Sequence, residues 1–167
     1  AQTEFSRVAS AHVALKRPPN AAYAGYGFAD PKFEGVGVLE LEHLRAPGRC
    51  PDGTGMISVY FVDAGEFRCL EQSDSELHNR AVKVVEQTFP EVSGETLFVH
   101  IIRWETAIAM FPRGRLTEMT RIRRRLESWS APIDLCGDYL DGLSSEGALR
   151  TGEQAADRLA NRLAGTT

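Results

Sequence analysis

The stretch that most constrains this chain lies near its end. The short stretch Ile133-Asp134-Leu135-Cys136 leads into Gly137-Asp138, and a long segment rich in small residues follows over 145–164. This order predicts a short buried strand, a tight turn that carries an acidic residue, and a helix. The rest of the chain is interpreted as what is arranged around that turn.

A turn of this kind has the groups needed to hold a polar, phosphate-bearing cofactor. The Asp138 carboxylate can accept hydrogen bonds from sugar-like hydroxyls, and the N–H groups near Glu146, Gly147 and Ala148 can face a phosphate or a carbonyl. Gly147 and Gly152 interrupt an alanine-rich helix, which suggests close packing there. The alternative is an ordinary turn with an acidic cap and small-residue helix packing.

Composition indicates an ordinary globular protein. The chain has 167 residues, a net charge of -4, 43% hydrophobic and 25% charged residues, which gives no general attraction to nucleic acid. Three widely spaced cysteines form no C-x-x-C pair, and no apolar run is long enough to span a membrane. We therefore expect a cytoplasmic protein with free thiols, Cys136 being packed in its strand.

Scattered histidines and one basic run suggest no further site. The four histidines lack metal-ligand spacing, so no metal is expected. The arginines of 121–125 are interpreted as a solvated helix face, balanced by Glu118 and Glu127.

The order of the predicted elements favours an α+β fold over repeated βα units. The second and third strands are expected to form an antiparallel hairpin, and Ser73 and Glu76 have capping-box spacing at the start of the first helix. Turn-rich segments are expected over 20–30 and 45–54. Strands are predicted over Phe5–Lys16, Gly35–Glu42, Gly55–Val62 and Leu97–Trp104, and helices over Asp74–Phe89, Gly114–Ser128 and Ser145–Ala164.

Two spaced motifs resemble those of a known superfamily. Gly137-Asp138-Tyr139-Leu140, followed by the stretch 146–152 and Ala155-Ala156, resembles the C-terminal flavin motif of the FAD-dependent amine oxidase, protoporphyrinogen oxidase and phytoene desaturase superfamily. Upstream, Arg103-Trp104, Ala107-Ile108, Phe111 and Gly114 resemble a second segment of the same enzymes. The resemblance covers about 98–164, and more loosely the strand that ends at Lys16-Arg17-Pro18.

The resemblance implies both a fold and a function. Residues 1–105 would supply part of a mixed, largely antiparallel substrate-domain sheet, and 106–167 the C-terminal strand-turn-helix that completes a Rossmann-like FAD-binding domain. The whole would be an FAD-dependent oxidoreductase that oxidises a C–H bond of an amine or an apolar substrate.

The resemblance also implies roles for individual residues. Asp138 would bind the ribityl or pyrophosphate region of FAD, and Gly147 and Ala148 would offer N–H groups to the isoalloxazine C2 carbonyl. No catalytic side chain and no metal ligand is implied. The implied cofactor-binding residues are Gly137, Asp138, Glu146, Gly147, Ala148 and Trp104, and the implied substrate-binding residues are Ile108 and Phe111.

The sequence departs from the family pattern most clearly in its glycines. The pairs Gly25/Gly27 and Gly35/Gly37 do not continue into the G-x-G-x-x-G turn that binds the ADP half of FAD. We therefore expect a complementary N-terminal chain or domain that carries this turn, or association of the chain with itself. The chain would then be a fragment, a processed subunit or one subunit of a split enzyme.

Smaller departures bear on the substrate. Ala109 and Arg115 stand where the family often has Pro and His, Gly114 and Ser144 best match the positions of an aromatic cage, and no Lys lies near Ser10. The missing aromatic pair and the missing lysine disfavour a small amine and favour a bulkier, porphyrinogen-like or polyene-like substrate. A function of another class stays open, that of a non-catalytic α+β module that binds a partner chain.

Overall fold

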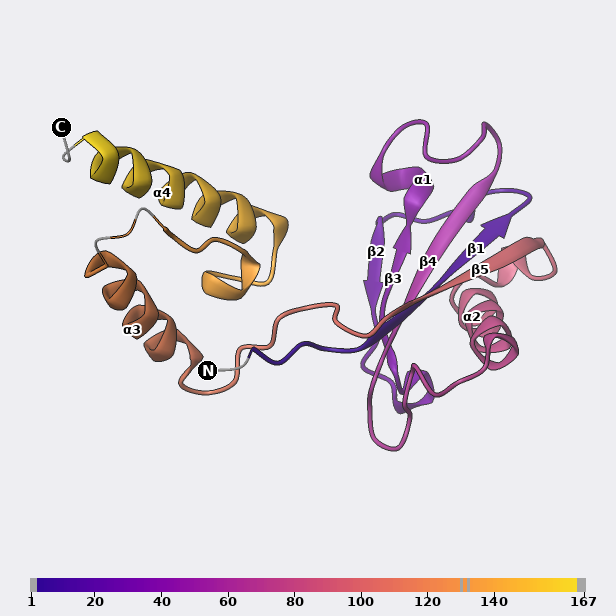
Figure 1. The fold of residues 1–167 in the computed structure, drawn as a ribbon. Coiled ribbons are helices and arrows are strands. Elements are labelled where there is room, and N and C mark those ends of the chain that lie inside the picture. The colour runs from indigo at the N-terminus through magenta and orange to yellow at the C-terminus, as the bar shows by residue number, and fades with distance from the viewer. Residues whose placement is uncertain (1–2, 130, 132, 165–167) are drawn as a thin grey trace. The chain divides into compact units, whose positions relative to one another are not determined.

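The structure is a computed structural model that describes residues 3–129, 131 and 133–164, and it consists of two compact units (Figure 1). Arg7–Ala107 form the first, here called the sheet unit. The described residues of Ala1–Ser6 and Ile108–Thr167 form the second, the helical unit. The division falls near the boundary expected after residue 105, except that the N-terminal residues group with the helical unit. What each part binds stays a prediction.

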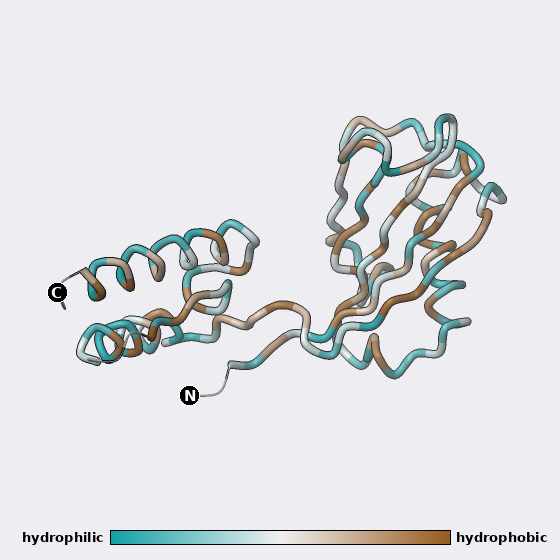
Figure 2. The backbone as a smooth tube through the Cα atoms, turned by 45° about the horizontal axis from the view of Figure 1, so that its top comes forward, coloured by the Kyte–Doolittle hydropathy of each residue, from teal (hydrophilic) through white to brown (hydrophobic). Residues whose placement is uncertain are grey.

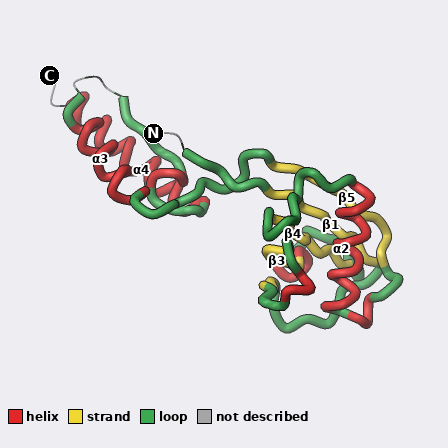
Figure 3. Tube along the Cα trace, turned by 90° about the horizontal axis from the view of Figure 1, so that it is seen from below, coloured by secondary structure: helices red, strands yellow, loops and turns green. Residues whose placement is uncertain are grey.

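The sheet unit is built on five antiparallel strands in the order β2-β3-β4-β1-β5 (Figures 1 and 3). The α+β class and the antiparallel pairing of the second and third predicted strands are confirmed. The elements are β1 (Val8–Leu15), β2 (Gly25–Gly27), β3 (Val36–Leu41), α1 (Glu42–Arg45), β4 (Gly55–Val62), α2 (Asp74–Thr88) and β5 (Thr96–Trp104).

Alternation along the strands creates one apolar face, and α2 covers it. Ala9, Ala11 and Val13 of β1 are fully buried on that face, because successive strand residues point to opposite sides of a sheet. From α2, Leu77, Ala81, Val84 and Val85 recur at helical spacing and are buried against it. The other buried members of this core include Leu15, Leu39, Leu41, Ile57, Val59, Phe61, Phe89 and Val92.

The predicted capping box at the start of α2 is present. Glu76 N–H donates to Ser73 Oγ at 3.3 Å, and Ser73 N–H donates to Glu76 Oε2 at 2.8 Å. Two N–H groups that the helix cannot satisfy internally are thereby paired. At the other end Phe89 caps the helix and Pro90 begins a 3-10 turn, as the proline predicts.

The helical unit contains α3 (Arg115–Glu127), a 3-10 turn at Asp138–Leu140, and α4 (Ser145–Ala164). Hydrophobic and hydrophilic residues alternate along both helices (Figure 2). The apolar residues buried within this unit are Ala109, Met119, Leu126, Leu140 and Ala155. This core is small, and the unit therefore also relies on polar contacts.

The predicted strand before the turn is not formed. Ile133 and Leu135 are 52% and 39% exposed, and Cys136 is exposed although we expected it to be packed. A strand requires a neighbour for its hydrogen bonds, and among the described residues none pairs with this segment. The segment is instead fastened to α4 by ion pairing of Asp134 with Arg158.

Two elements were not predicted. Strand β2 lies inside the turn-rich segment 20–30, where Gly25 and Gly27 flank Tyr26. Glycine has a low strand propensity, so pairing with β3 decides this element. The single-turn helix α1 begins at Glu42, the last residue of the predicted second strand, and ends at Arg45, where the predicted loop begins.

Replacing Ser73 by Ala should destabilise the sheet unit by about 1 kcal/mol, because the helix loses its N-cap acceptor. Urea unfolding followed by Trp104 fluorescence, in a Trp129→Phe background, reports on this unit alone. Ser93→Ala, at an exposed site beyond α2, is the control. Equal unfolding midpoints for the two variants would contradict the capping role.

Candidate functional site

The predicted turn is held to α4 by one buried hydroxyl. Gly137 N–H donates to Thr151 Oγ1 at 2.9 Å. The Thr151 hydroxyl hydrogen in turn lies within reach of the carbonyl oxygens of Gly137, Gly147 and Ala148, at 3.1, 2.9 and 3.0 Å. Thr151 is only 2% exposed. It therefore fixes the position of the turn relative to the first turns of the helix, and the sequence pattern did not single it out.

Glycines allow the chain to approach itself closely here. Gly137 has φ 142°, and a Cβ there would lie 2.4 Å from the Tyr139 ring. A Cβ at Gly147 would lie 2.7 Å from the carbonyl oxygen of Gly142, which is a backbone atom and cannot move alone. Gly152 has nothing within 4 Å of its Cβ position among the described residues. Close packing inside this unit is thus present at Gly147 and not at Gly152.

The N-terminus of α4 presents free donors, one of them at Glu146, but not at Gly147 and Ala148, to which the resemblance assigns the N–H contacts with the flavin carbonyl. Gly147 N–H donates to Ser144 Oγ at 3.2 Å, and Ala148 N–H donates to the Ser144 carbonyl at 3.1 Å. The N–H groups of Ser145 and Glu146 have no hydrogen-bond partner among the described residues. These two N–H groups are therefore the donors open to a ligand, at the positive end of the helix dipole.

Asp138 keeps part of its carboxylate free. Its Oδ1 accepts the Tyr139 N–H at 2.9 Å and the side chain is half-buried. Within the described part of the chain no bond to Oδ2 is present. That oxygen can accept a hydrogen bond from a ligand hydroxyl.

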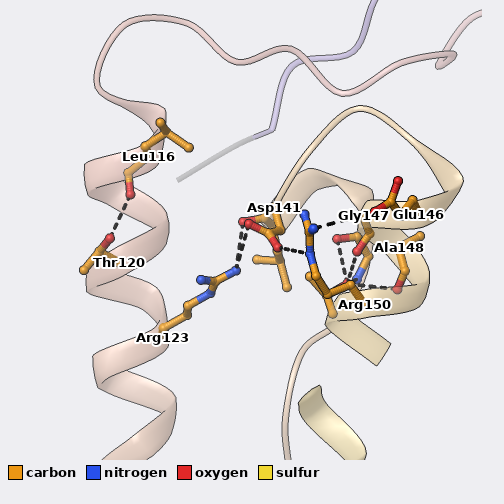
Figure 4. A network of polar contacts seen from close by, with 11 residues as sticks. Leu116, Thr120, Arg123, Asp141, Glu146, Gly147, Ala148 and Arg150 are labelled. Carbon is orange, nitrogen blue, oxygen red and sulfur yellow. Dashed lines mark hydrogen bonds and ion pairs between the residues drawn. The ribbon is translucent and has the colours of Figure 1, made fainter. Parts of the chain in front are cut away.

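Asp141, which the motif did not mark, links three elements (Figure 4). Arg150 Nε of α4 donates to Asp141 Oδ2 at 2.8 Å, and Arg123 Nη2 of α3 lies 3.7 Å from Oδ1. Arg123 also donates to the Leu140 carbonyl at 3.3 Å. The prediction that 121–125 form only a solvated face is therefore wrong for Arg123, which joins α3 to the turn.

A second ion pair orders the segment before the turn. Asp134, whose side chain is 1% exposed, accepts from Arg158 Nε at 2.7 Å and Nη2 at 3.3 Å. The Arg158 hydrogen bonds hold the pKa of Asp134 below its ordinary value, although burial opposes this. Asp134 thus stays ionised and keeps its hold on α4 at neutral pH.

The other predicted site residues lie elsewhere. Trp104 ends β5 in the sheet unit and is 49% exposed. Ile108 is exposed, and its backbone N–H and carbonyl bond Ser6 of the N-terminal segment. Phe111 is half-buried. The residues that one turn brings together are Gly137, Asp138, Glu146, Gly147 and Ala148.

No group of three or more His, Cys, Asp or Glu side chains is placed to hold a metal ion in the part of the chain that the structure describes. Over the same residues, no helix is both long and apolar enough to cross a membrane.

Thr151→Val should destabilise the helical unit by about 1–3 kcal/mol, because the Gly137 N–H then has no acceptor. Unfolding followed by Trp129 fluorescence in a Trp104→Phe background measures this. Thr120→Val is the matched control, since its hydroxyl donates to the Leu116 carbonyl on the exposed side of α3 (Figure 4). A loss as small as that of the control would show that Thr151 does not anchor the turn.

Alanine at the two glycines of α4 should act in opposite directions. Gly147→Ala should destabilise the unit by roughly 1–3 kcal/mol through overpacking against Gly142. Gly152→Ala should stabilise it by about 1 kcal/mol, because alanine is the better helix former. Thermal unfolding of the two variants tests the difference. A shift of the same sign in both would contradict the close approach at Gly147.

Comparison with known proteins identifies the family. The family described as flavin containing amine oxidoreductase matches residues 1–160, whereas no curated protein matches the sequence. Two solved structures resemble the chain at 13% and 12% sequence identity, and at such low identity they show a likeness of fold alone.

A crystal structure of a protein assigned as a protoporphyrinogen oxidase, from Exiguobacterium sp. 255-15, has 13% identity and a TM-score of 0.72. The match covers 96% of this chain and 36% of the Exiguobacterium chain. The structure of reduced UDP-galactopyranose mutase has 12% identity and a TM-score of 0.69. The match covers 95% of this chain and 34% of the mutase chain. The chain thus spans about a third of these structures. Because the family match extends over almost all of its residues, the chain belongs to the flavin-containing amine oxidoreductase family.

Proposed function

We propose that this chain is the flavin-closing and substrate-sheet portion of an FAD-dependent oxidoreductase that oxidises a C–H bond of an amine or an apolar substrate. The observation that carries the proposal is the turn at 137–148, which presents unbonded N–H groups and a free carboxylate oxygen on a rigid support. Family membership supplies the flavin as the expected ligand.

The residues of the turn fit a flavin nucleotide. Asp138 Oδ2 would accept from hydroxyl groups of the ribityl chain or of the sugar. The N–H groups of Ser145 and Glu146 would donate to a carbonyl or phosphate oxygen, in the role that the resemblance gives to Gly147 and Ala148. Glycine at 147 lets the turn approach α4, so these donors and the carboxylate stay on one short segment.

FAD, when bound, supplies the two-electron acceptor of the reaction. The chain contributes position and electrostatics. The helix dipole and the N–H groups at the start of α4 favour negative charge beside them. Asp141, paired with Arg123 and Arg150, keeps those donors from moving.

A complementary part would hold the ADP half of FAD. The related structures are about three times as long as this chain, and no G-x-G-x-x-G turn occurs in its 167 residues. Exposed leucines and isoleucines of the helical unit support a further packing partner, because monomers rarely expose many large apolar side chains together. Those around the turn and α4 are Ile133, Leu135, Leu143, Leu149 and Leu163.

The substrate is proposed to lie against the aromatic and aliphatic side chains that the resemblance assigns. Ile108 is 44% exposed and Phe111 is half-buried, so both can contact a ligand. Their apolar surfaces suit a bulky, flat or extended apolar substrate better than a small amine.

Asp138→Asn should weaken FAD binding about tenfold or more, since a hydrogen bond to a charged acceptor contributes about 1.5–3 kcal/mol. The variant keeps the size of the side chain and an acceptor for Tyr139 N–H. The measurement is flavin absorbance after the chain is combined with a dinucleotide-binding part of the same family and FAD.

Asp157→Asn, at an exposed position of α4, is the control and should bind FAD as the unchanged chain does. Equal binding by both variants would remove Asp138 from the site. If the unchanged chain forms a complex that takes up no flavin, the non-catalytic partner-binding module becomes the better description.

A further inference from the structure

The sheet face opposite α2 carries a connected row of polar side chains. On β1, Ser10 and His12 point to this face, because Ala9, Ala11 and Val13 fill the other. His12 stands opposite Ser58 of β4 and opposite His100 of β5. We call this surface the open face.

Hydrogen bonds fix the tautomer of His12. The Ser58 hydroxyl donates its single hydrogen to Glu42 Oε1 at 2.8 Å, since an ionised carboxylate can only accept. Ser58 Oγ, 2.9 Å from His12 Nδ1, must therefore accept, and Nδ1 carries the proton. His12 Nε2 is then the bare nitrogen, and it accepts the Ser10 hydroxyl at 3.2 Å.

The far end of this row is a buried charge. Glu42 is 5% exposed and forms an ion pair with Arg49. Burial raises the pKa of Glu42, but hydrogen bonds from Ser58 and Arg49 outweigh it and hold the pKa below its ordinary value. The carboxylate thus stays ionised and keeps Ser58 oriented.

His12 is kept neutral by its surroundings. Burial lowers the pKa of His12, His100 lowers it further, and Glu42 opposes both without reversing them. Of the other titratable groups on this face, Tyr60 lies on β4 and Glu40 on β3, where Arg45 neutralises it. At neutral pH the bare Nε2 is therefore a hydrogen-bond acceptor and a base.

Within this row a ligand can reach His12. Ser10 and Ser58 are 2% and 0% exposed, whereas His12 is partly exposed. Apolar and aromatic side chains lie further along the same face, opposite Ala14, Ser10 and Val8 of β1. They are Met56 and Tyr60 of β4, and Phe98, Ile102 and Trp104 of β5, with Phe98 59% and Trp104 49% exposed.

We infer that His12 is the proton-accepting contact of this face, for a flat apolar ligand that carries one N–H or O–H donor. Ser58 and Glu42 are positioning residues that act through the His12 tautomer. The inference rests on the proposed function in so far as that ligand is the oxidised substrate.

The proton of the ligand's N–H or O–H group, here written X–H, would pass to His12 Nε2. The X–H group of the substrate replaces Ser10 at Nε2 and gives up its proton, while the electron pair of the X–H bond stays on X. The imidazole becomes a cation, and its Nδ1–H still donates to Ser58. Because Ser58 is hydrogen-bonded to the Glu42 carboxylate, the negative charge of Glu42 stabilises this cation. FAD, when bound, would supply the acceptor for the hydrogen of the neighbouring C–H bond, which leaves with both bond electrons as a hydride, and the electron pair left on X would form the new X=C bond.

The test uses the 167-residue chain without flavin. Nitrogen NMR should show His12 as the Nδ1–H tautomer with a pKa below 6.5. Ser58→Ala should turn the single tautomer into a mixture. His78→Gln, at an exposed position of α2, should leave the His12 signals unchanged. An Nε2–H tautomer in the unchanged chain would overturn the inference.

Indole and 1-methylindole are the probes for the ligand site, since they differ chiefly in the N–H donor. Indole should shift the His12 Nε2 resonance at concentrations at least tenfold lower than 1-methylindole, and His12→Gln should abolish the difference. Equal shifts by the two probes would refute the donor contact. In the complemented protein His12→Gln should leave flavin absorbance unchanged, which separates this result from the test of Asp138.

Discussion

The hydroxyl of Thr151 is the contact on which the helical unit depends. A turn with Gly137 at φ 142° and an extended segment before it have few apolar contacts of their own. Thr151 supplies both an acceptor and a donor where Gly137 of the turn meets α4. A buried hydroxyl with every bond made adds order without the penalty of an unpaired polar group. The available N–H groups of Ser145 and Glu146 are rigid because of it.

The sheet unit uses the same device in another setting. Ser58 is fully buried between a charged acceptor and an imidazole, and its one hydrogen determines which nitrogen of His12 carries a proton. In each unit one buried hydroxyl, that of Thr151 or of Ser58, determines which neighbouring groups act as hydrogen-bond donors and which as acceptors. The large apolar side chains contribute the burial that stabilises the sheet, and the hydroxyls specify the chemistry of the surfaces.

Local signals in the sequence were sufficient for most of the fold. The apolar residues over 55–62, the capping box at Ser73 and the small-residue pattern of 145–164 each describe one element, and each element is present. Signals that depend on a neighbour failed. Strand β2 forms because β3 pairs with it, whereas the stretch 133–136 has no neighbouring strand among the described residues and stays unpaired. Of the donors expected at the start of α4, the Glu146 N–H is open, whereas the Gly147 N–H is bonded to the capping Ser144 hydroxyl, a contact that spacing alone does not reveal.

The extended segment before the turn has an energetic consequence. Asp134 is gripped by Arg158, and the Ile133 carbonyl accepts from Arg162, so this stretch is already aligned along α4 without strand pairing. Ordering a free chain costs roughly 1–2 kcal/mol per residue. Here the contacts of Arg158 and Arg162 offset the entropy cost of ordering the segment in the absence of a paired strand. A strand that pairs with 133–136 would therefore bind more tightly, because less of its hydrogen-bond energy would be offset by the entropy cost of ordering this segment.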